Sequence, residues 1–138
     1  MNLAGFNFNK ISIEKFSDKV ETLKIETNMD ISDINKIESN FLKSNEELLK
    51  INFTYTVNYN PNLAKIELSG QVFIRTDSKK SKDILKQWKN KKLAEDFKMP
   101  LLNFILRKSN LKALELEEEM NLPLHIPLPH LKNQGKKE

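Results

Sequence analysis

Cysteine is absent from this chain of 138 residues, and glycine, histidine and arginine are scarce. The lack of cysteine excludes disulfides, thiolate nucleophiles and cysteine-ligated metals. The 3 glycines form no phosphate-binding loop, and no serine lies in a nucleophile elbow. Most residue types by which active sites are recognised are therefore missing, so we expect a protein that is not an enzyme and needs no cofactor.

Long hydrophobic runs are also absent, and none approaches the roughly 20 residues of a membrane-spanning helix. The first residues lack the basic and apolar regions of a secretory signal. With 38% hydrophobic and 30% charged residues, the composition is that of a soluble globular protein. We expect a cytoplasmic protein without membrane insertion. It should form a single α+β domain over residues 1–131, followed by a mobile basic tail at 132–138.

Strict alternation of apolar and polar residues marks two neighbouring segments. Over residues 49–59 the odd positions are apolar or aromatic. After Asn60-Pro61-Asn62, over residues 64–74, the even positions are apolar or glycine. A period of two in adjacent runs predicts an antiparallel pair of strands with one buried and one wet face. Gly70 lies in the middle of the second run, where it indicates a bulge or a closely approaching backbone.

Two further strands are predicted before this pair. The alternation over 6–13 slips by one residue near Asn9-Lys10, which is typical of a β-bulge. A second run alternates over 23–31. Ser32-Asp33 then indicates the cap of a short helical turn over 34–37.

Helical spacing follows the strands. Asp77 or Ser78 is expected to cap a first helix that carries Trp88 on its apolar face. A second helix is expected over 94–108, where Pro100 marks either its first turn near Met99 or a bend.

Ser109-Asn110 predicts a break before a third helix over 111–120. Glu117, Glu118 and Glu119 fan out around such a helix, which favours a solvated face over a metal or acid–base site. The fold class that these elements predict is α+β, with a four-stranded antiparallel sheet followed by two or three helices on one face.

The segment from 121 to 131 is rich in both proline and leucine. Pro123, Pro127 and Pro129 exclude a helix and favour an extended chain. Exposure of its apolar side chains to water would be costly, so we expect them to pack against another apolar surface. These residues are Leu122, Leu124, Ile126, Leu128 and Leu131. Packing against its own sheet, its own helix or a second subunit is favoured. The alternative is that the segment borders an apolar groove for extended polypeptides.

The two histidines and the lysines suggest no specific chemistry. His125 and His130 match no metal-binding spacing, so we interpret them as partly exposed loop residues without a metal. Residues 79–92 are rich in lysine, but they lack the interleaved exposed aromatic residues that proteins need to bind single-stranded nucleic acid. A solvated helix face is favoured there, with RNA or ribosome contact as the alternative.

The order of elements resembles that of the SecB-type preprotein-translocation chaperones. The opening strand of that family has an aromatic residue followed by Ile-Ser, and this chain has the similar run Phe8-Asn9-Lys10-Ile11-Ser12-Ile13-Glu14. The main helix of the family precedes a Pro/Leu-rich segment, which residues 122–129 resemble in character. Residues 102–129 also resemble an uncharacterised archaeal family with a Leu-Asn-Phe-Ile-Leu-Arg core.

The resemblance implies a SecB-like, ATP-independent holdase that binds unfolded or nascent polypeptides in apolar grooves and assembles as a dimer or tetramer. It implies no metal and no cofactor. The residues that we expect to line the peptide-binding groove are Phe53, Tyr55, Trp88, Leu124, Ile126 and Leu128. The alternative function is that of a basic RNA- or ribosome-associated protein, although nucleic acid is not the favoured partner.

Overall fold

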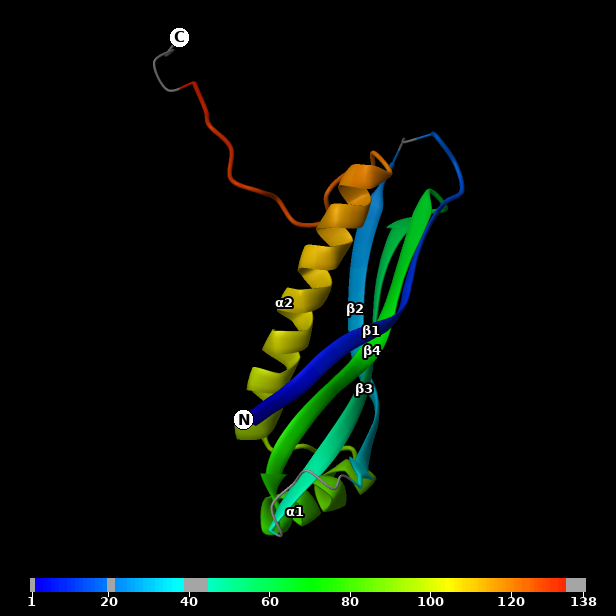
Figure 1. Cartoon of the computed structure of the whole chain (residues 1–138). Helices are drawn as coiled ribbons and strands as arrows, with labels where there is room; N and C mark the ends of the chain where they lie inside the picture. The colour runs from blue at the N-terminus through cyan, green and yellow to red at the C-terminus, as the bar shows by residue number, and fades with distance from the viewer. Residues whose placement is uncertain (1, 20–21, 39–44, 134–138) are drawn as a thin grey trace.

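The chain folds into a four-stranded antiparallel sheet and two helices (Figure 1). The computed structural model describes residues 2–19, 22–38 and 45–133. The strands are β1 (Asn2–Lys15), β2 (Lys24–Ile37), β3 (Glu46–Asn60) and β4 (Ala64–Asp77), in the order β1-β4-β3-β2. The helices are α1 (Ser78–Lys89) and α2 (Glu95–Glu119). The predicted α+β class is confirmed, with two helices after the strands.

The predicted hairpin forms the centre of the sheet. β3 and β4 pair from Glu46 opposite Asp77 to Tyr59 opposite Ala64. The alternating apolar residues of both strands face the helices and make the core. Its buried members from the two strands are Leu49, Ile51, Phe53, Tyr55, Val57, Tyr59, Ala64, Ile66, Leu68, Val72 and Ile74.

The expected bulge in β1 and the close approach at Gly70 are the same feature. The register between β1 and β4 shifts between Phe8 and Lys10, next to the pairing of Phe8 with Gly70. A Cβ atom on Gly70 would lie 2.1 Å from the carbonyl oxygen of Asn7. Only glycine therefore lets the bulged backbone of β1 lie this close to β4.

The predicted helical turn at 34–37 is wrong, because β2 continues as a strand to Ile37. The register between β2 and β3 shifts between Ile31 and Asp33. This irregularity brings Ile31 and Ile34 to the same buried face at a spacing of three, which imitates a helical pattern. The Asp33 carboxylate accepts from the backbone N–H of Ile34 at 2.9 Å and from Asn35 Nδ2 at 2.9 Å.

Helix α1 lies across one end of the sheet, at the bottom of Figure 1. Asp77 caps it as predicted, because its side chain accepts from the N–H of Lys80 at 2.7 Å. Ile84 and Ser81 are its buried residues, and Trp88 lies half-buried near its end.

Helix α2 lies along the inner face of the sheet, over β3 and β4 (Figure 1). Its buried residues recur every four positions as Leu101, Ile105, Ser109, Ala113 and Glu117. The predicted break at Ser109-Asn110 and the separate third helix are therefore wrong. Ser109 is small enough to face the sheet, so the helix continues through it. Pro100 lies inside α2, which excludes a helix that begins near Met99.

The described end of the chain, after α2, has no regular secondary structure through Asn133. The tail that we expected to be mobile lies outside the described residues from 134 onward. Neither α1 nor α2 is long and apolar enough to span a bilayer.

Candidate functional site

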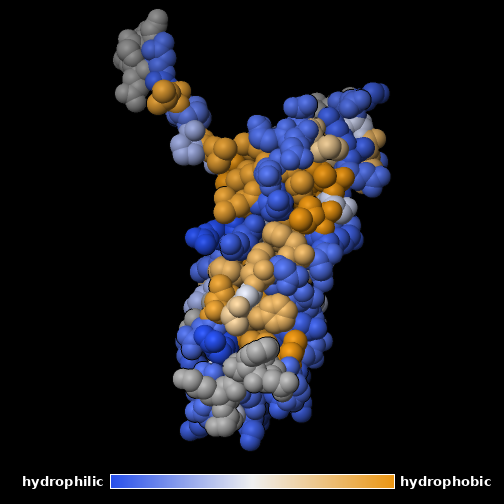
Figure 2. All heavy atoms as spheres, in the orientation of Figure 1, coloured by the Kyte–Doolittle hydropathy of each residue, from blue (hydrophilic) through white to orange (hydrophobic). Residues whose placement is uncertain are grey.

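Helix α2 covers the two central strands and leaves the inner faces of both edge strands partly open. On the β1 side, apolar side chains run between β1 and α2, where orange colour gathers in Figure 2. We call this surface the β1 strip, and it consists of Leu3, Phe6, Phe8, Ile11, Phe104 and Leu111. Ile11 is 48% exposed and Leu111 is 61% exposed.

The middle of the β1 strip is tightly packed by aromatic rings. Phe6 stacks on Phe53 with ring centroids 5.6 Å apart and meets Phe104 edge-on at 5.5 Å. The Lys108 ammonium lies 5.8 Å from both outer rings, Phe6 and Phe104. The strip is thus an apolar surface with half-buried rings in its middle and exposed side chains at its margins.

On the β2 side of α2 the surface is hollowed into a pocket of about 740 Å³. We call it the β2 pocket. Its apolar lining consists of Met29, Ile31, Trp88, Leu93 and Leu102, and its polar lining of Asp30, Ser32, Lys91 and Lys98. The Lys91 ammonium lies 3.7 Å from the centroid of the Trp88 ring.

The pocket follows from the way that the elements are arranged. Because α2 lies mainly over β3 and β4, it leaves Met29 on the inner face of β2 only half-buried. Trp88 closes the lower end from α1. Leu93 in the linker and Leu102 in α2 form the remaining wall. The pocket is therefore lined by four separate parts of the chain: β2, α1, the linker after α1, and α2.

The Pro/Leu-rich segment after α2, residues 121–133, is called the arm below. It turns away from α2 at Asn121, whose φ is 54°, and buries Leu122 against the core. The Tyr59 hydroxyl donates to the carbonyl oxygen of Pro123 at 2.6 Å. The arm then folds back along β3 from Tyr59 toward Tyr55.

A buried polar cluster fixes the base of the arm. His125 Nδ1 lies 2.7 Å from Glu117 Oε2, and the backbone N–H of His125 donates to Glu117 Oε1 at 3.1 Å. His125 Nε2 lies 2.8 Å from the Tyr55 hydroxyl and 3.3 Å from Asn110 Oδ1. The Tyr55 hydroxyl in turn donates to Asn110 Oδ1 at 2.6 Å. We call these four residues the arm anchor.

The arm anchor corrects two expectations. The side chains of His125 and Glu117 are 2% and 0% exposed, whereas we expected a partly exposed loop histidine and a solvated glutamate. Each residue is buried because the other supplies its polar partner from a distant part of the chain. His130, further along the arm, is exposed.

Burial and the neighbouring carboxylate act on the two tyrosines of this region. Burial raises the pKa of Tyr55 well above its ordinary value, and the Glu117 charge raises it further. Burial also raises the pKa of Tyr59, with Glu117 as the second cause. Both phenols therefore stay neutral at physiological pH and act as hydrogen-bond donors. Among the residues that the structure describes, no cluster of side chains is suited to hold a metal ion.

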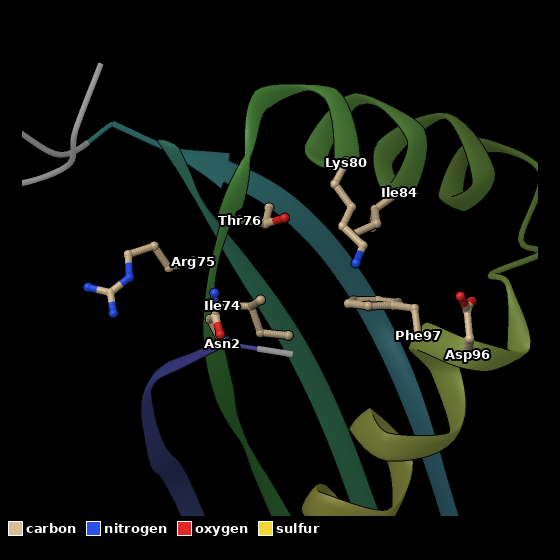
Figure 3. A pocket seen from close by; sticks show the side chains of 8 residues that line it. All are labelled: Asn2, Ile74, Arg75, Thr76, Lys80, Ile84, Asp96 and Phe97. Atoms are coloured by element: carbon tan, nitrogen blue, oxygen red, sulfur yellow. The ribbon is translucent and has the colours of Figure 1, made fainter. Parts of the chain in front are cut away.

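A smaller hollow of about 100 Å³ lies between the start of β1, the end of β4 and both helices (Figure 3). Ile74, Ile84 and Phe97 line its interior, and Lys80 and Asp96 lie at its edge. A space of this size holds only a few water molecules. It is too small for a stretch of polypeptide.

Comparison with known proteins gives a structural match without a sequence match. No family model matches the chain, and no curated protein matches its sequence. A solved SecB-like chaperone of Mycobacterium tuberculosis, in complex with a ChAD peptide from an antitoxin, superposes with a TM-score of 0.52. The match covers 96% of this chain and 91% of that chain at 8% sequence identity. The chain has a SecB-like fold.

The SecB-like fold confirms the resemblance that the order of elements suggested. An identity of 8% assigns no role to any individual residue of this chain. The comparisons give no support to the archaeal relative that the sequence also suggested.

The residues that we expected in the groove are placed in three different environments. Phe53 and Tyr55 are buried in the core beneath α2, where a peptide cannot reach them in this conformation. Trp88 lines the β2 pocket. Leu124 and Ile126 lie half-buried on either side of His125 in the arm. The sixth residue, Leu128, is exposed beyond them.

The structure adds four apolar pocket residues that were not expected there, Met29, Ile31, Leu93 and Leu102. Met29 lies on the apolar face of a predicted strand, so the alternation of apolar and polar residues placed its side chain on the correct face of the sheet. The alternation did not predict that a pocket lies there. Leu93 follows a lysine-rich turn and shows no local pattern that indicates a site.

Proposed function

We propose that this protein is an ATP-independent chaperone that holds unfolded or nascent polypeptides, with the β2 pocket as its binding site. The observation that carries the proposal is an open pocket of about 740 Å³ beside the inner face of the edge strand β2, with five apolar and four polar residues in its lining. The SecB-like fold supports it, because the chaperone that shares this fold was solved with a bound peptide.

The chemistry of the pocket suits an unfolded chain. A volume of this size lies in the range of ordinary ligand pockets and holds several aliphatic or aromatic side chains. Apolar contacts are non-directional, so such a pocket accepts many sequences without a fixed pattern of polar partners. Lys91 and Lys98 at its edge favour apolar segments that also carry acidic residues.

The pocket continues toward the arm. Met29, which lines the pocket, pairs with Tyr55 in the register of β2 and β3. The Tyr55 hydroxyl contacts His125, and His125 lies between the half-buried Leu124 and Ile126. Trp88 and Leu124 then border one surface for an extended client, and Ile126 and Leu128 lie beyond it in the arm. Phe53 and Tyr55 lie beneath it as its support.

A client-aggregation assay tests this function. We expect the wild-type protein to suppress aggregation of a denatured client without ATP, and Leu93→Asp to lose most of that effect. Met99→Asp is the matched control, because Met99 is 47% exposed near the start of α2 and does not line the pocket. Both variants are first compared with wild type by circular dichroism. If the wild-type protein leaves aggregation unchanged, the holdase proposal is wrong.

The oligomeric part of the proposal rests on the β1 strip. We propose a homo-oligomer in which a second copy covers the exposed Ile11 and Leu111. Light scattering tests it: Ile11→Asp should lower the measured mass toward that of one chain. A wild-type protein with the mass of one chain at micromolar concentration would exclude this assembly.

Helix α1 favours a second candidate function, the binding of RNA or the ribosome. Its lysines and those of the following turn are exposed, and none of them forms an ion pair within the described residues. They are Lys79, Lys80, Lys82, Lys86, Lys89, Lys91 and Lys92. Binding of this kind weakens steeply as salt rises, so an RNA titration at two salt concentrations separates it from the apolar pocket.

A further inference from the structure

We infer that the outer part of the arm, residues 126–131, is an internal ligand of the β2 pocket that clients must displace. The inference rests on the proposed function and adds the regulation and the ligand class of the same site. In the structure the outer arm lies outside the pocket and leaves the body of the molecule (Figure 1).

The arm anchor points the chain at the pocket. Pro123 contacts Tyr59, which pairs with Ile25 of β2, and His125 contacts Tyr55, which pairs with Met29. The arm thus runs along the sheet in the direction in which β2 runs from Ile25 to Met29. The pocket begins at Met29 and continues to Ser32. The outer arm therefore starts beside the upper end of the pocket.

The outer arm is held by little else. No residue from 126 to 133 forms a hydrogen bond or ion pair within the part of the chain that the structure describes. Leu128 is 52% exposed and Leu131 is 100% exposed. Exposed leucines gain free energy in an apolar site within reach, and the pocket is such a site in the direction in which the arm runs.

The length of the outer arm is sufficient. Six residues in an extended, proline-rich conformation span about 19 Å at roughly 3.1 Å each. The stretch of β2 from Met29 to Ser32 covers about 10 Å at roughly 3.3 Å per residue. Leu128 and Leu131 can therefore both enter the pocket while the arm anchor stays in place.

The prolines define how such a ligand binds. Pro127 and Pro129 have no backbone N–H, so the outer arm cannot pair with β2 as a regular added strand. It has to bind through its side chains in the pocket. Clients that displace it should likewise be extended segments whose leucines lie two or three residues apart, with prolines tolerated between them.

Trp88 provides a direct readout, because it is the only tryptophan of the chain and lines the pocket. In the full-length variant Leu128→Asp/Leu131→Asp, two charges keep the outer arm out of the pocket. We expect its Trp88 emission to move to longer wavelength and its quenching by acrylamide to increase. His130→Asp/Asn133→Asp is the matched control, which adds two carboxylates to the arm and keeps both leucines.

Affinity gives a second readout. A synthetic peptide with the sequence of residues 121–132 should bind the Leu128→Asp/Leu131→Asp variant about tenfold more tightly than wild type, if the arm fills the pocket nine-tenths of the time. Equal emission and equal affinity in the variant and wild type would overturn the inference. Wild-type emission that changes on dilution would also overturn it, because the arm would then occupy a second copy.

The outcomes separate this inference from the proposed function. Peptide that binds wild type and variant equally leaves the pocket as a client site and removes the internal ligand. A shift in Trp88 emission without suppression of client aggregation by either protein keeps the internal ligand and removes the chaperone.

Discussion

Oε2 of Glu117 lies 2.7 Å from Nδ1 of His125, and both side chains are closed off from solvent. Neither atom has a well-aligned hydrogen bond to another described group, so each depends on the other. A buried carboxylate without its partner is costly, because it has lost its hydration and gains nothing in return. The pair therefore ties the start of the arm to α2.

Removal of the histidine should destabilise the fold strongly. His125→Ala leaves Oε2 of the buried Glu117 carboxylate without a partner, and we expect a loss of about 3–5 kcal/mol in the free energy of unfolding. Urea denaturation measures it. The double variant Glu117→Leu/His125→Leu should recover most of the loss. A cost of less than about 1 kcal/mol for His125→Ala would contradict the pairing.

Alkaline pH should unfold the protein through its two tyrosines. The pKa of Tyr55 and that of Tyr59 lie above the ordinary value of 10.0 in the folded chain. Above pH 10 the unfolded chain loses these protons and the folded chain keeps them. Stability is therefore complete below that pH and falls above it, by about 1.4 kcal/mol per pH unit for each tyrosine.

Absorbance of tyrosinate in the near ultraviolet measures this directly, because the chain has 2 tyrosines and both are buried. The absorbance should rise only together with the loss of circular dichroism. Ionisation near pH 10 in a protein with unchanged circular dichroism would show that the phenols are open to solvent.

Gly70, in β4 opposite the bulge of β1, should tolerate no side chain. Gly70→Ala places a methyl group 2.1 Å from the Asn7 carbonyl oxygen, and we expect a loss of about 1–3 kcal/mol or more. Gly5→Ala is the control, since its methyl group would lie 3.6 Å from Phe73. Thermal unfolding compares the two. Similar melting temperatures for both variants would be inconsistent with the bulge.

Two neighbouring residues of α2 should respond in opposite directions. Ser109 is buried with no partner for its hydroxyl among the described groups, so Ser109→Ala should stabilise the protein by about 1 kcal/mol. Asn110→Ala removes the acceptor of the Tyr55 hydroxyl and should destabilise it by about 1–2 kcal/mol. Urea denaturation of both variants provides the comparison, and destabilisation by Ser109→Ala would reveal an unrecognised partner.

The sheet was predictable because strand periodicity is local. β3, β4 and the bulge of β1 follow from alternation alone, since each side chain reports the face of its own strand. The end of β2 was not predictable in this way. Its bulge places Ile31 and Ile34 on one face, and a spacing of three residues is also the spacing of a helix.

The candidate site was less predictable because its parts meet only in the folded chain. Glu117 in a run of glutamates indicates a solvated face, and nothing near it in sequence points to His125 as its partner. Leu93 and Trp88 reach the pocket because α1 and the linker after it pack beside β2. Phe53 and Tyr55 were correctly placed on the inner face, but α2 covers that face where they lie.

The most direct test of the proposed chaperone is a titration of the Leu128→Asp/Leu131→Asp variant, whose pocket the arm does not fill, with a denatured, leucine-rich client, followed by Trp88 emission at low and high salt. Our account predicts a saturable change in emission whose midpoint is nearly the same at both salt concentrations, because the apolar side chains of the β2 pocket hold the client. No change in emission at any client concentration, or binding that disappears at high salt, would contradict it.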